Sequence, residues 1–515
     1  MADRKTYFLN GVTATIEDAE NITREECLQL ARAGRDAWNG WRREFPSRKS
    51  PNDVFVNTAN FNVVDFRGLV VDFSGFEFGD GANFRNAKFA DGVNFNDSRF
   101  GDSAQFVSAD FEGFAFFNRV RCGDGADFQC ARFRTGVSFA ESLFGRAANW
   151  RGTQIGGVSW FHGARFGERA HFSGTQFEGQ AHFDGAEFGD LARFDGAQFG
   201  DLSSFRCVEF GGQITFAGKD WASVQRFYGH NFKERRDQAT DLGLAPNCFA
   251  HVAFDGANFN GSVDFSGRDF TQPARFSNLP EDASFKRPRL LPVDISLNKL
   301  PSVCLEEFKV LEGRPTCFAV APRFHECKLH QDTSFDGAIF PAPRGNDGAA
   351  RAYRTLKLAF SKQQAIREEQ RFFKLEMQEE AARESGAKRW LYRAYDYCSD
   401  FGFSVWRPFE QLVALPAVGF AFAYLLLMAL NRSELIHMTR IDQSAIAAQW
   451  LQFTFANLLP LPDSSLIKDL RLELFGKPGT WITLLAYGLE TLQKLMTLIA
   501  YFLMGLALRN LFKMK

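Results

Sequence analysis

Aromatic residues recur along this chain at alternating steps of six and five residues, starting at Phe78 and ending at Phe232. The two steps make a period of 11 residues, so two periods make 22, and no slip occurs over the 154 residues that separate these two positions. An amphipathic helix is excluded, because these spacings do not stay on one face of a helix with 3.6 residues per turn. A short fixed period is typical of solenoids, in which each turn stacks on its neighbours.

Reading every 22nd residue sorts the aromatic positions into four columns, and Phe occupies 25 of their 29 positions. The columns are Phe84, Phe106, Phe128, Trp150, Phe172, Phe194 and Phe216; Phe89, Phe111, Phe133, Ile155, Phe177, Phe199 and Trp221; Phe95, Phe117, Phe139, Phe161, Phe183, Phe205 and Phe227; and Phe78, Phe100, Cys122, Phe144, Phe166, Phe188, Phe210 and Phe232. The unusual count of 59 Phe in 515 residues therefore has an architectural cause.

A small residue usually stands two positions before each ring, as Ala82 stands before Phe84. Residues i and i−2 of an extended chain point to the same face, so the small and the large side chain are both predicted to face inward. Pairs such as Gly189-Asp190 fill the intervening positions and suit tight corners. The sequence therefore predicts a mainly β solenoid with four short sides and 22 residues per coil.

Units such as AQFGD, AHFDG and AEFGD resemble those of the pentapeptide-repeat family. This resemblance implies a right-handed four-sided β-helix, which we expect over residues 51–345. The repeat is expected to be regular over 78–232, interrupted at 233–248 by a loop or short helix, and irregular over 280–315. Additional coils are expected from Phe61, Phe66, Phe73, Phe254, Phe259, Phe265, Phe270, Phe276, Phe318, Phe324, Leu329, Phe335 and Phe340.

A β-helix exposes backbone and rings at both ends, so both ends need covers. Residues 22–45 have helical spacing and are followed by Pro46, so we expect a helix within an N-terminal cap at 1–50. Its Trp38 and Trp41 are expected to pack rather than to form a ligand platform. The stretch AWNGWR that contains them resembles the AWNxWR helix that precedes the repeats of bacterial pentapeptide-repeat proteins.

At the other end, residues 346–387 lack Pro and are dense in helix-forming residues, which predicts one long connecting helix. Its charges are expected to form a solvated face, and a coiled-coil seam between subunits is the alternative.

From residue 388 the composition changes to aromatic residues mixed with basic ones, which is typical of a headgroup interface. The interfacial aromatic residues are expected to be Trp390, Tyr392, Tyr395 and Trp406. Leu412 to Leu430 form an uncharged run of 19 residues, enough to span about 28 Å of a hydrocarbon core of about 30 Å. We expect an α-helical transmembrane hairpin within 388–515, with spans at about 409–430 and 481–508. A buried core helix is the alternative for the first span.

The second span carries polar residues on one side, namely Glu490, Lys494, Thr497 and Tyr501. Glu490 and Lys494 stand at i and i+4, so they are expected to pair. This polar stripe is expected either to face a pore or to pack against other helices.

Residues 445–461, between the two spans, form a short uncharged run that contains Gln449, Gln452, Thr454 and Asn457. We expect a re-entrant segment, because the run is at the lower limit for a span and Pro460 ends it. The arrangement resembles the pore module of two-helix potassium channels, but the TVGYG filter is absent, so potassium selectivity is not predicted. An anchoring hairpin would have the same topology. Flanking basic residues predict that the β-helix and the C-terminus lie in the cytoplasm. The resemblance to bacterial pentapeptide-repeat proteins implies that the membrane is the bacterial inner membrane.

Chemical motifs are lacking. The 60 basic and 61 acidic residues argue against a nucleic-acid partner, and nine scattered cysteines without a CxxC pair indicate neither a disulfide framework nor a zinc site. We found no P-loop, dinucleotide fingerprint, HExxH or nucleophile elbow, so no catalytic, cofactor or metal site is expected and the chain is predicted not to be an enzyme. His171 and His182 are expected on opposite sides of the solenoid, with His162, His230 and His251 isolated.

Three functions fit these patterns. The leading hypothesis is a cytoplasmic β-helix that binds a protein partner or signal, joined to a membrane module that contacts lipid and forms a homo-oligomeric, channel-like or membrane-perturbing assembly. The alternative is a non-conducting, membrane-tethered interaction scaffold. The third is DNA mimicry toward topoisomerases, which the family resemblance implies. It is disfavoured because residues 51–285 carry 30 acidic and 21 basic groups, whereas duplex DNA carries a charge every ~1.7 Å.

Overall fold

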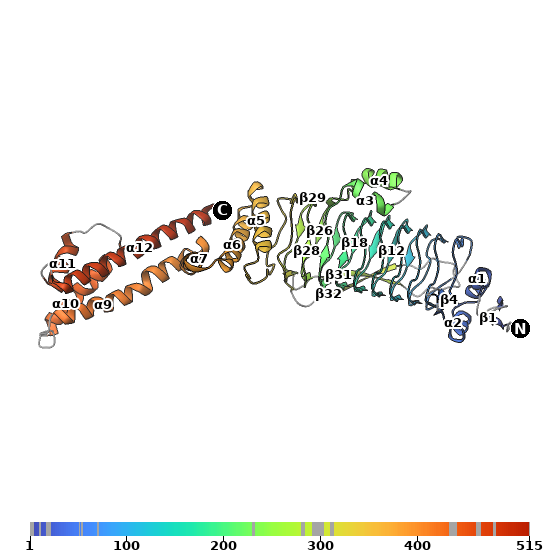
Figure 1. Cartoon of the computed structure of the whole chain (residues 1–515), viewed down its shortest axis with the longest axis horizontal. Helices are drawn as coiled ribbons and strands as arrows, with labels where there is room; N and C mark the ends of the chain where they lie inside the picture. The colour runs from blue at the N-terminus through green and yellow to red at the C-terminus, as the bar shows by residue number, and fades with distance from the viewer. Residues whose placement is uncertain are drawn as a thin grey trace. The chain divides into compact units, whose positions relative to one another are not determined.

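The computed structural model describes residues 5–9, 12–16, 22–50, 52, 55–69, 72–228, 232–279, 284–290, 303–309, 314–431, 440–459, 465–476 and 480–513. The chain divides into two compact units, Met1–Ala342 with Arg351–Glu369 and Pro343–Ala350 with Gln370–Lys515. The first unit contains a β-solenoid of about nine turns with helices at its N-terminal end, and the second is a set of helices (Figure 1). The predicted fold class is confirmed.

The N-terminal cover consists of an antiparallel hairpin, β1 (Lys5–Leu9) and β2 (Val12–Ile16), and two helices, α1 (Arg24–Arg32) and α2 (Arg35–Glu44). Thr23 and Glu26 form a reciprocal capping box that starts α1. The expectation of one helix over 22–45 is wrong, because Gly34 takes a φ of 94° and separates the two helices.

The two tryptophans of α2 pack onto the first coil, as predicted. Trp38 is fully buried, and its ring centroid lies 5.6 Å from those of both Phe61 and Phe78. Its indole Nε1 donates a hydrogen bond to the Glu77 carbonyl at 2.8 Å. The fully buried Trp41 lies 5.3 Å from Trp38, ring centroid to centroid, so both residues contribute to the apolar cover of the solenoid.

Four parallel sheets form the sides of the solenoid, and their strands pair residues 22 apart over the regular part, as Arg99 pairs with Arg121. The 9-stranded sheet contains β5 (Glu77–Gly79), β7 (Arg99–Phe100), β10 (Arg121–Cys122), β13 (Leu143–Phe144), β16 (Arg165–Phe166), β19 (Glu187–Phe188), β23 (Glu209–Phe210), β27 (Asn258–Phe259) and β33 (Cys317–Phe318). The 8-stranded sheet contains β6 (Lys88–Phe89), β8 (Asp110–Phe111), β11 (Arg132–Phe133), β14 (Gln154–Ile155), β17 (Gln176–Phe177), β21 (Gln198–Phe199), β25 (Cys248–Phe249) and β29 (Asp269–Phe270).

The 7-stranded sheet contains β9 (Ala115–Phe116), β12 (Gly136–Ser138), β15 (Val158–Trp160), β18 (Ala181–His182), β22 (Ser203–Ser204), β26 (Val252–Ala253) and β30 (Ala274–Arg275). The fourth side contains β20 (Ala192–Arg193), β24 (Ile214–Thr215) and β28 (Val263–Asp264), and single parallel bridges such as Asn149 to His171 extend it. A small antiparallel pair, β3 (Arg48–Lys49) and β4 (Phe55–Val56), precedes the regular coils.

The rings of each predicted column stack along the solenoid axis. Phe84 and Phe106 lie 4.9 Å apart, centroid to centroid, with parallel planes, and Trp150 stacks on Phe172 at 4.7 Å. Rings of different columns meet edge to face, as Phe161 meets Phe172 at 89°. Both geometries are favourable for aromatic pairs, so the columns form one continuous core.

The small residues that precede the rings are buried beside them, as predicted. Ala104 and Ala126 have no exposed surface. Where the small residue is Thr175, its hydroxyl donates to the Trp150 carbonyl of the preceding coil at 2.6 Å, so the buried polar atom has a partner.

A first insertion leaves the ring stack intact. Phe216 stacks on Phe265 with centroids 5.2 Å apart, although 49 residues separate them instead of 22. The additional residues include α3 (Trp221–Tyr228) and α4 (Phe232–Asp241). The chain thus leaves the column after Phe216, returns to it at Phe265, and forms two helices in between.

The predicted position of this interruption, 233–248, is corrected by these helices. Trp221, Phe227 and Phe232 belong to α3 and α4 rather than to the ring columns. Their spacing agrees with the period, but the next ring to stack on Phe216 is Phe265. Spacing alone therefore assigned these three residues to the columns incorrectly.

A second insertion follows the same principle. Phe259 stacks on Phe318 at 5.0 Å, although 59 residues separate them. The stretch between them contains an antiparallel hairpin, β31 (Ser284–Leu290) and β32 (Val303–Lys309), within the region predicted to be irregular. The opening and closing coils are also confirmed by stacking, as in the pair Phe61 and Phe84 at 4.9 Å.

Helix α5 (Asp347–Lys362) packs on the last coil. The ring centroid of Phe360 lies 6.1 Å from that of Phe335, and the ring centroid of Tyr353 lies 5.8 Å from that of Phe340. Through these contacts α5 covers the end of the ring columns.

One long helix over 346–387 is not formed. After α5, Gln364 takes a φ of 59° and the Ala365 amide donates to the Phe360 carbonyl at 3.0 Å, which closes the helix end. Two further helices follow, α6 (Ile366–Arg383) and α7 (Gly386–Ser399). Neither break contains a Pro, and at the first one the left-handed turn at Gln364 satisfies a terminal carbonyl of α5.

The second unit continues with α8 (Trp406–Phe409), a π-helical stretch at Glu410–Ala414, and α9 (Leu415–Asn431). The π-helical stretch precedes Pro416, whose missing N–H removes a helical hydrogen bond. The remaining helices are α10 (Arg440–Ala456), α11 (Ser465–Phe475) and α12 (Trp481–Lys513). Tyr424, Phe453, Leu474, Phe475 and Ala486 have no exposed surface and form the centre of their shared core.

Candidate functional site

The polar stripe of α12 contains a buried carboxylate with two cationic partners. Glu490 is 1% exposed, and the Lys494 Nζ donates to its Oε1 at 2.7 Å, which confirms the predicted i, i+4 pair. Arg471 of α11 adds a second ion pair, with its Nε 2.9 Å from the Glu490 Oε2. Its guanidinium also lies 4.9 Å from the ring centroid of Tyr487. The sequence did not indicate Arg471, because it lies 19 residues away on a helix that was not predicted.

A second set of hydrogen bonds, centred on Gln493, lies beside this ion-pair cluster. Gln493 is 2% exposed, its Oε1 accepts from the Tyr424 hydroxyl at 2.9 Å, and its Nε2 donates to the Thr454 carbonyl at 3.2 Å. Thr497 is buried and donates to the Gln493 carbonyl at 2.9 Å, whereas Tyr501 is 42% exposed. The stripe thus has a packed inner part, Glu490 to Thr497, and an exposed outer residue.

The predicted re-entrant residues lie on or just after α10, and they face different surroundings. Gln449 donates to Glu473 of α11 at 2.6 Å, and Gln452 is exposed. Thr454 is buried, with its hydroxyl bonded to the Trp450 carbonyl. Asn457 has no exposed surface, and within the described part of the chain its side-chain amide has no hydrogen-bond partner.

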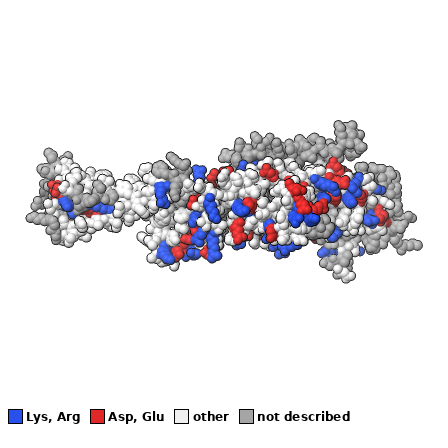
Figure 2. Space-filling view, turned by 90° about the horizontal axis from the view of Figure 1, so that it is seen from above, with Lys and Arg blue, Asp and Glu red and all other residues white. Residues whose placement is uncertain are grey.

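Two helical stretches are long and apolar enough to cross a membrane, Trp406–Asn431 and Trp481–Asn510. They agree with the spans expected at 409–430 and 481–508. Only 28% of the most apolar window of each stretch is buried, and Val418 and Phe422 are 72% and 70% exposed. In Figure 2, charged side chains are few over the C-terminal helices and frequent over the solenoid. Both stretches therefore present apolar side chains outward.

The expected interfacial aromatic residues divide into two groups. Trp390 and Trp406 are 73% and 76% exposed, so their rings are available to an interface. Tyr392 instead donates to Glu380 at 3.3 Å, and Tyr395 packs edge to face on Phe401 at 5.6 Å.

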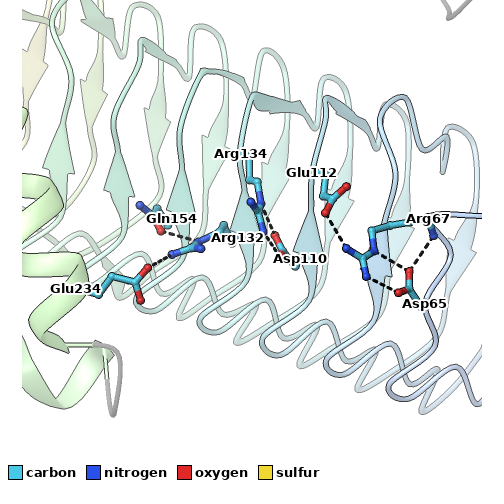
Figure 3. A network of polar contacts seen from close by, with 8 residues as sticks. All are labelled: Asp65, Arg67, Asp110, Glu112, Arg132, Arg134, Gln154 and Glu234. Atoms are coloured by element: carbon cyan, nitrogen blue, oxygen red, sulfur yellow. Dashed lines mark hydrogen bonds and ion pairs between the residues drawn. The ribbon is translucent and has the colours of Figure 1, made fainter.

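A ladder of charged side chains follows one side of the solenoid. The Arg67 guanidinium bridges Asp65 and Glu112, and this hydrogen bonding holds the pKa of the Asp65 carboxyl well below its ordinary value (Figure 3). Farther along the same side, Arg134 pairs with Asp110 at 2.6 Å. The Arg134–Asp110 pair connects neighbouring coils, and the Arg67–Glu112 pair reaches across the coil between its two partners.

Helix α4 is fastened to the same side. Arg132 pairs with Glu234 of α4 at 3.1 Å and donates to the Gln154 Oε1 at 3.0 Å (Figure 3). Arg235 is 2% exposed and donates to the Gly152 and Cys130 carbonyls of two coils. The interruption of the repeat is therefore a docked helical element.

A basic hollow of about 510 Å³ lies on the 9-stranded side. Arg99, Arg121 and Arg165 occupy equivalent positions of β7, β10 and β16, with Leu143 of β13 between the last two. Arg119 at its rim pairs with Asp97 at 2.7 Å. The equivalent residues of the flanking strands are Glu77, which pairs with Arg99 at 3.8 Å, and Glu187, which pairs with Arg165 at 3.2 Å, so the row of arginines ends in a carboxylate on each side.

The expectation that His162 is isolated is wrong. The closest ligand atoms of His162, His182 and Asp184 all lie within 4.8 Å of one another. The 22-residue coil brings residues 20 and 22 positions apart together, whereas the spacing argument considered only His171 and His182. His230 lies outside the described residues.

The comparisons agree with the geometry of the solenoid. Residues 161–208 match the family described as pentapeptide repeats, with 9 copies. The chain therefore contains a pentapeptide-repeat β-solenoid, in coils of about 22 residues. Neither the curated proteins nor the solved structures gave a match.

Proposed function

We propose that this protein is a membrane-tethered pentapeptide-repeat scaffold, in which the C-terminal helices anchor the chain in a bilayer and the β-solenoid binds a protein partner. The membrane anchor is inferred from the apolar side chains that Trp406–Asn431 and Trp481–Asn510 turn outward. Only 28% of the most apolar window of each helix is buried. A soluble core helix of this length would bury most of such a surface. Membrane lipid is the environment that this surface fits.

The scaffold interpretation also draws on the polar stripe. Lys494 and Arg471 neutralise Glu490 inside the chain, Gln493 accepts a hydrogen bond from Tyr424 of α9, and Thr497 donates one to Gln493. These side chains are used in packing the bundle, and ionisable groups within spans are expected to pair in this way. The packing alternative for the stripe is therefore favoured over the pore alternative.

The partner surface that we favour is the basic hollow of Arg99, Arg121 and Arg165. Three arginines at the same strand position, in coils where Leu143 takes the fourth place, match a partner with an acidic, extended surface, because charge complementarity guides association and register. The bacterial inner membrane, with the solenoid in the cytoplasm, is the proposed location, on the basis of the basic flanks of the spans.

Single arginine substitutions test the anchor. Val418→Arg and Phe422→Arg place a charge on the outward face of α9, where each costs about 2.5 to 3.5 kcal/mol at the centre of a span. We expect both variants to shift from the membrane fraction toward the soluble or aggregated fraction. Val63→Arg, at a 59% exposed position of the solenoid, is the matched control and is expected to stay in the membrane fraction. Unchanged membrane integration of both α9 variants would contradict the anchor.

A second candidate is a homo-oligomeric, channel-like or membrane-perturbing assembly. A hollow of about 440 Å³ beside α11 and α12 favours it, because Lys468, Asp469, Arg471 and Thr483 give this hollow polar walls within the membrane module. Flux of ions from liposomes that contain the purified protein tests this candidate. An ion flux that changes in the Arg471→Met variant would favour the channel-like assembly. If intact oligomers give no flux, the non-conducting scaffold is the remaining hypothesis.

A further inference from the structure

We propose that His162, His182 and Asp184 form a binding site for one divalent transition-metal ion, such as Zn²⁺, on the side of the solenoid. The three residues come from two adjacent coils, and one ligand atom of each lies within 4.8 Å of the other two. Imidazole nitrogens with one carboxylate oxygen suit Zn²⁺ and other first-row divalent ions rather than Mg²⁺ or Ca²⁺.

The distances fit a site that contracts slightly when the ion enters. The Asp184 Oδ2 lies 3.8 Å from the His162 Nδ1 and 3.9 Å from the His182 Nδ1. Both distances exceed a hydrogen bond, so an aspartate-histidine hydrogen bond does not explain the cluster. Ligand atoms about 2.0 to 2.1 Å from a tetrahedral Zn²⁺ lie roughly 3.3 Å from one another, which small side-chain rotations would reach.

The carboxylate is oriented by the fold. The Asp184 Oδ1 accepts from the Arg206 amide at 2.9 Å and from the Ser204 hydroxyl, so Oδ2 is the oxygen directed at the two imidazoles. The equivalent Asn118 makes the same corner with an amide oxygen, which accepts from the Ala140 amide at 3.2 Å. The corner therefore needs only one acceptor oxygen, and the second oxygen of Asp184 is additional.

The second imidazole is also held in a metal-binding form. The His182 Nε2 lies 3.2 Å from the Gln180 Oε1, an acceptor, so Nε2 carries the proton and Nδ1 presents its lone pair. The ring stacks on Trp160 with centroids 4.4 Å apart. Metal-binding histidines usually donate their other N–H to such an oxygen, which fixes the tautomer.

The surroundings limit access to the cluster. The side chains of His162 and Asp184 are 5% and 6% exposed, and that of His182 is 17% exposed. An ion would enter from the His182 side and keep one position for water.

Metal binding to the chelator-treated full-length protein in detergent tests this site. We expect one Zn²⁺ per chain by calorimetry after the cysteines are alkylated, and Co²⁺ is expected to give visible absorption without a thiolate charge-transfer band. Zinc should also raise the melting temperature, because it binds only the folded chain. Absence of zinc binding would overturn the proposal.

Two substitutions and a control locate the ion. Asp184→Asn keeps the Oδ1 acceptor of the corner but removes the carboxylate, and His182→Ala removes one imidazole. Each is expected to weaken zinc binding at least tenfold. In the presence of chelator, the melting temperature of Asp184→Asn should stay within a few degrees of that of the wild type. His171→Ala changes a half-buried histidine outside the cluster and should bind zinc like the wild type. Equal affinity in Asp184→Asn and the wild type, or equal weakening by His171→Ala, would overturn the assignment.

Discussion

The Nε of Arg471 on α11 lies 2.9 Å from the Oε2 of Glu490 on α12, and the two side chains are only 16% and 2% exposed. Lys494 pairs with the same carboxylate from one turn later on α12. A buried charge of this kind depends on its partners, because the desolvation of an unpaired ion costs several kcal/mol. The ion pairs therefore link α11 to α12, whatever the bundle does in the membrane.

Glu490→Gln is expected to destabilise the helical bundle by about 3 to 5 kcal/mol, because it removes the buried carboxylate with which both Arg471 and Lys494 pair. The triple replacement of Glu490 by Leu and of both cations by Met should restore most of the loss. Thermal unfolding in detergent measures both. Glu473→Gln, on the more exposed side of α11, is the control and should change stability by less than about 0.5 kcal/mol. A Glu490→Gln protein as stable as the wild type would contradict this role.

Phe172→Ala should reduce the free energy of unfolding of the solenoid by about 3 to 5 kcal/mol, because the ring has no exposed surface and stacks on both Trp150 and Phe194. Denaturant unfolding followed by circular dichroism measures the change. Leu202→Ala, at a 50% exposed corner, should have an effect within about 0.5 kcal/mol. Similar losses in the two variants would show that the column does not carry the stability.

Cys27 predicts a pH dependence at the N-terminal cover. Burial raises the pKa of its thiol to about 12, from an ordinary value of 9.0. Above pH 9 the unfolded chain loses this proton while the folded chain keeps it. The stabilising contribution is therefore complete below pH 9 and declines between pH 9 and 12, by up to ~1.4 kcal/mol per pH unit.

The measurement is the difference in unfolding free energy between the wild type and Cys27→Ala from pH 8 to pH 11. Taking this difference cancels the effect of the other titrating groups. The wild type should lose stability faster above pH 9. Parallel pH profiles would mean that the thiol ionises equally easily in both states.

Arg235→Met is expected to release α4 from the solenoid, because the buried guanidinium donates to the carbonyls of Gly152 and Cys130. Amide hydrogen exchange in 232–241 should accelerate, while exchange in the ring columns should not. Arg236→Met is the matched control, since its side chain is 43% exposed and pairs with its neighbour Asp237. Equal exchange in the two variants would argue that other contacts, such as Arg132 with Glu234 and Gln154 with Gln238, hold the helix.

Most of the solenoid could be predicted from the sequence, because a coil repeats its contacts at a constant residue spacing. The columns around Phe172 and the small residues before the rings followed from the periodicity, and the cover formed by Trp38 followed from the helical spacing of residues 22–45. The spans and the pair of Glu490 with Lys494 could also be predicted, since run length and an i, i+4 spacing are local properties.

Contacts between distant residues were decided only by the tertiary structure. The pairing of Arg471 with Glu490 needed the position of α11, and the cluster of His162, His182 and Asp184 needed the register between two coils. Trp221 and Phe232 show the limit of periodicity, because both fit the period and both lie on helices. Local spacing determined which residues can face the core. The inserted segments determined where the repeat stops and resumes, because their free energy depends on the contacts that they make with the solenoid.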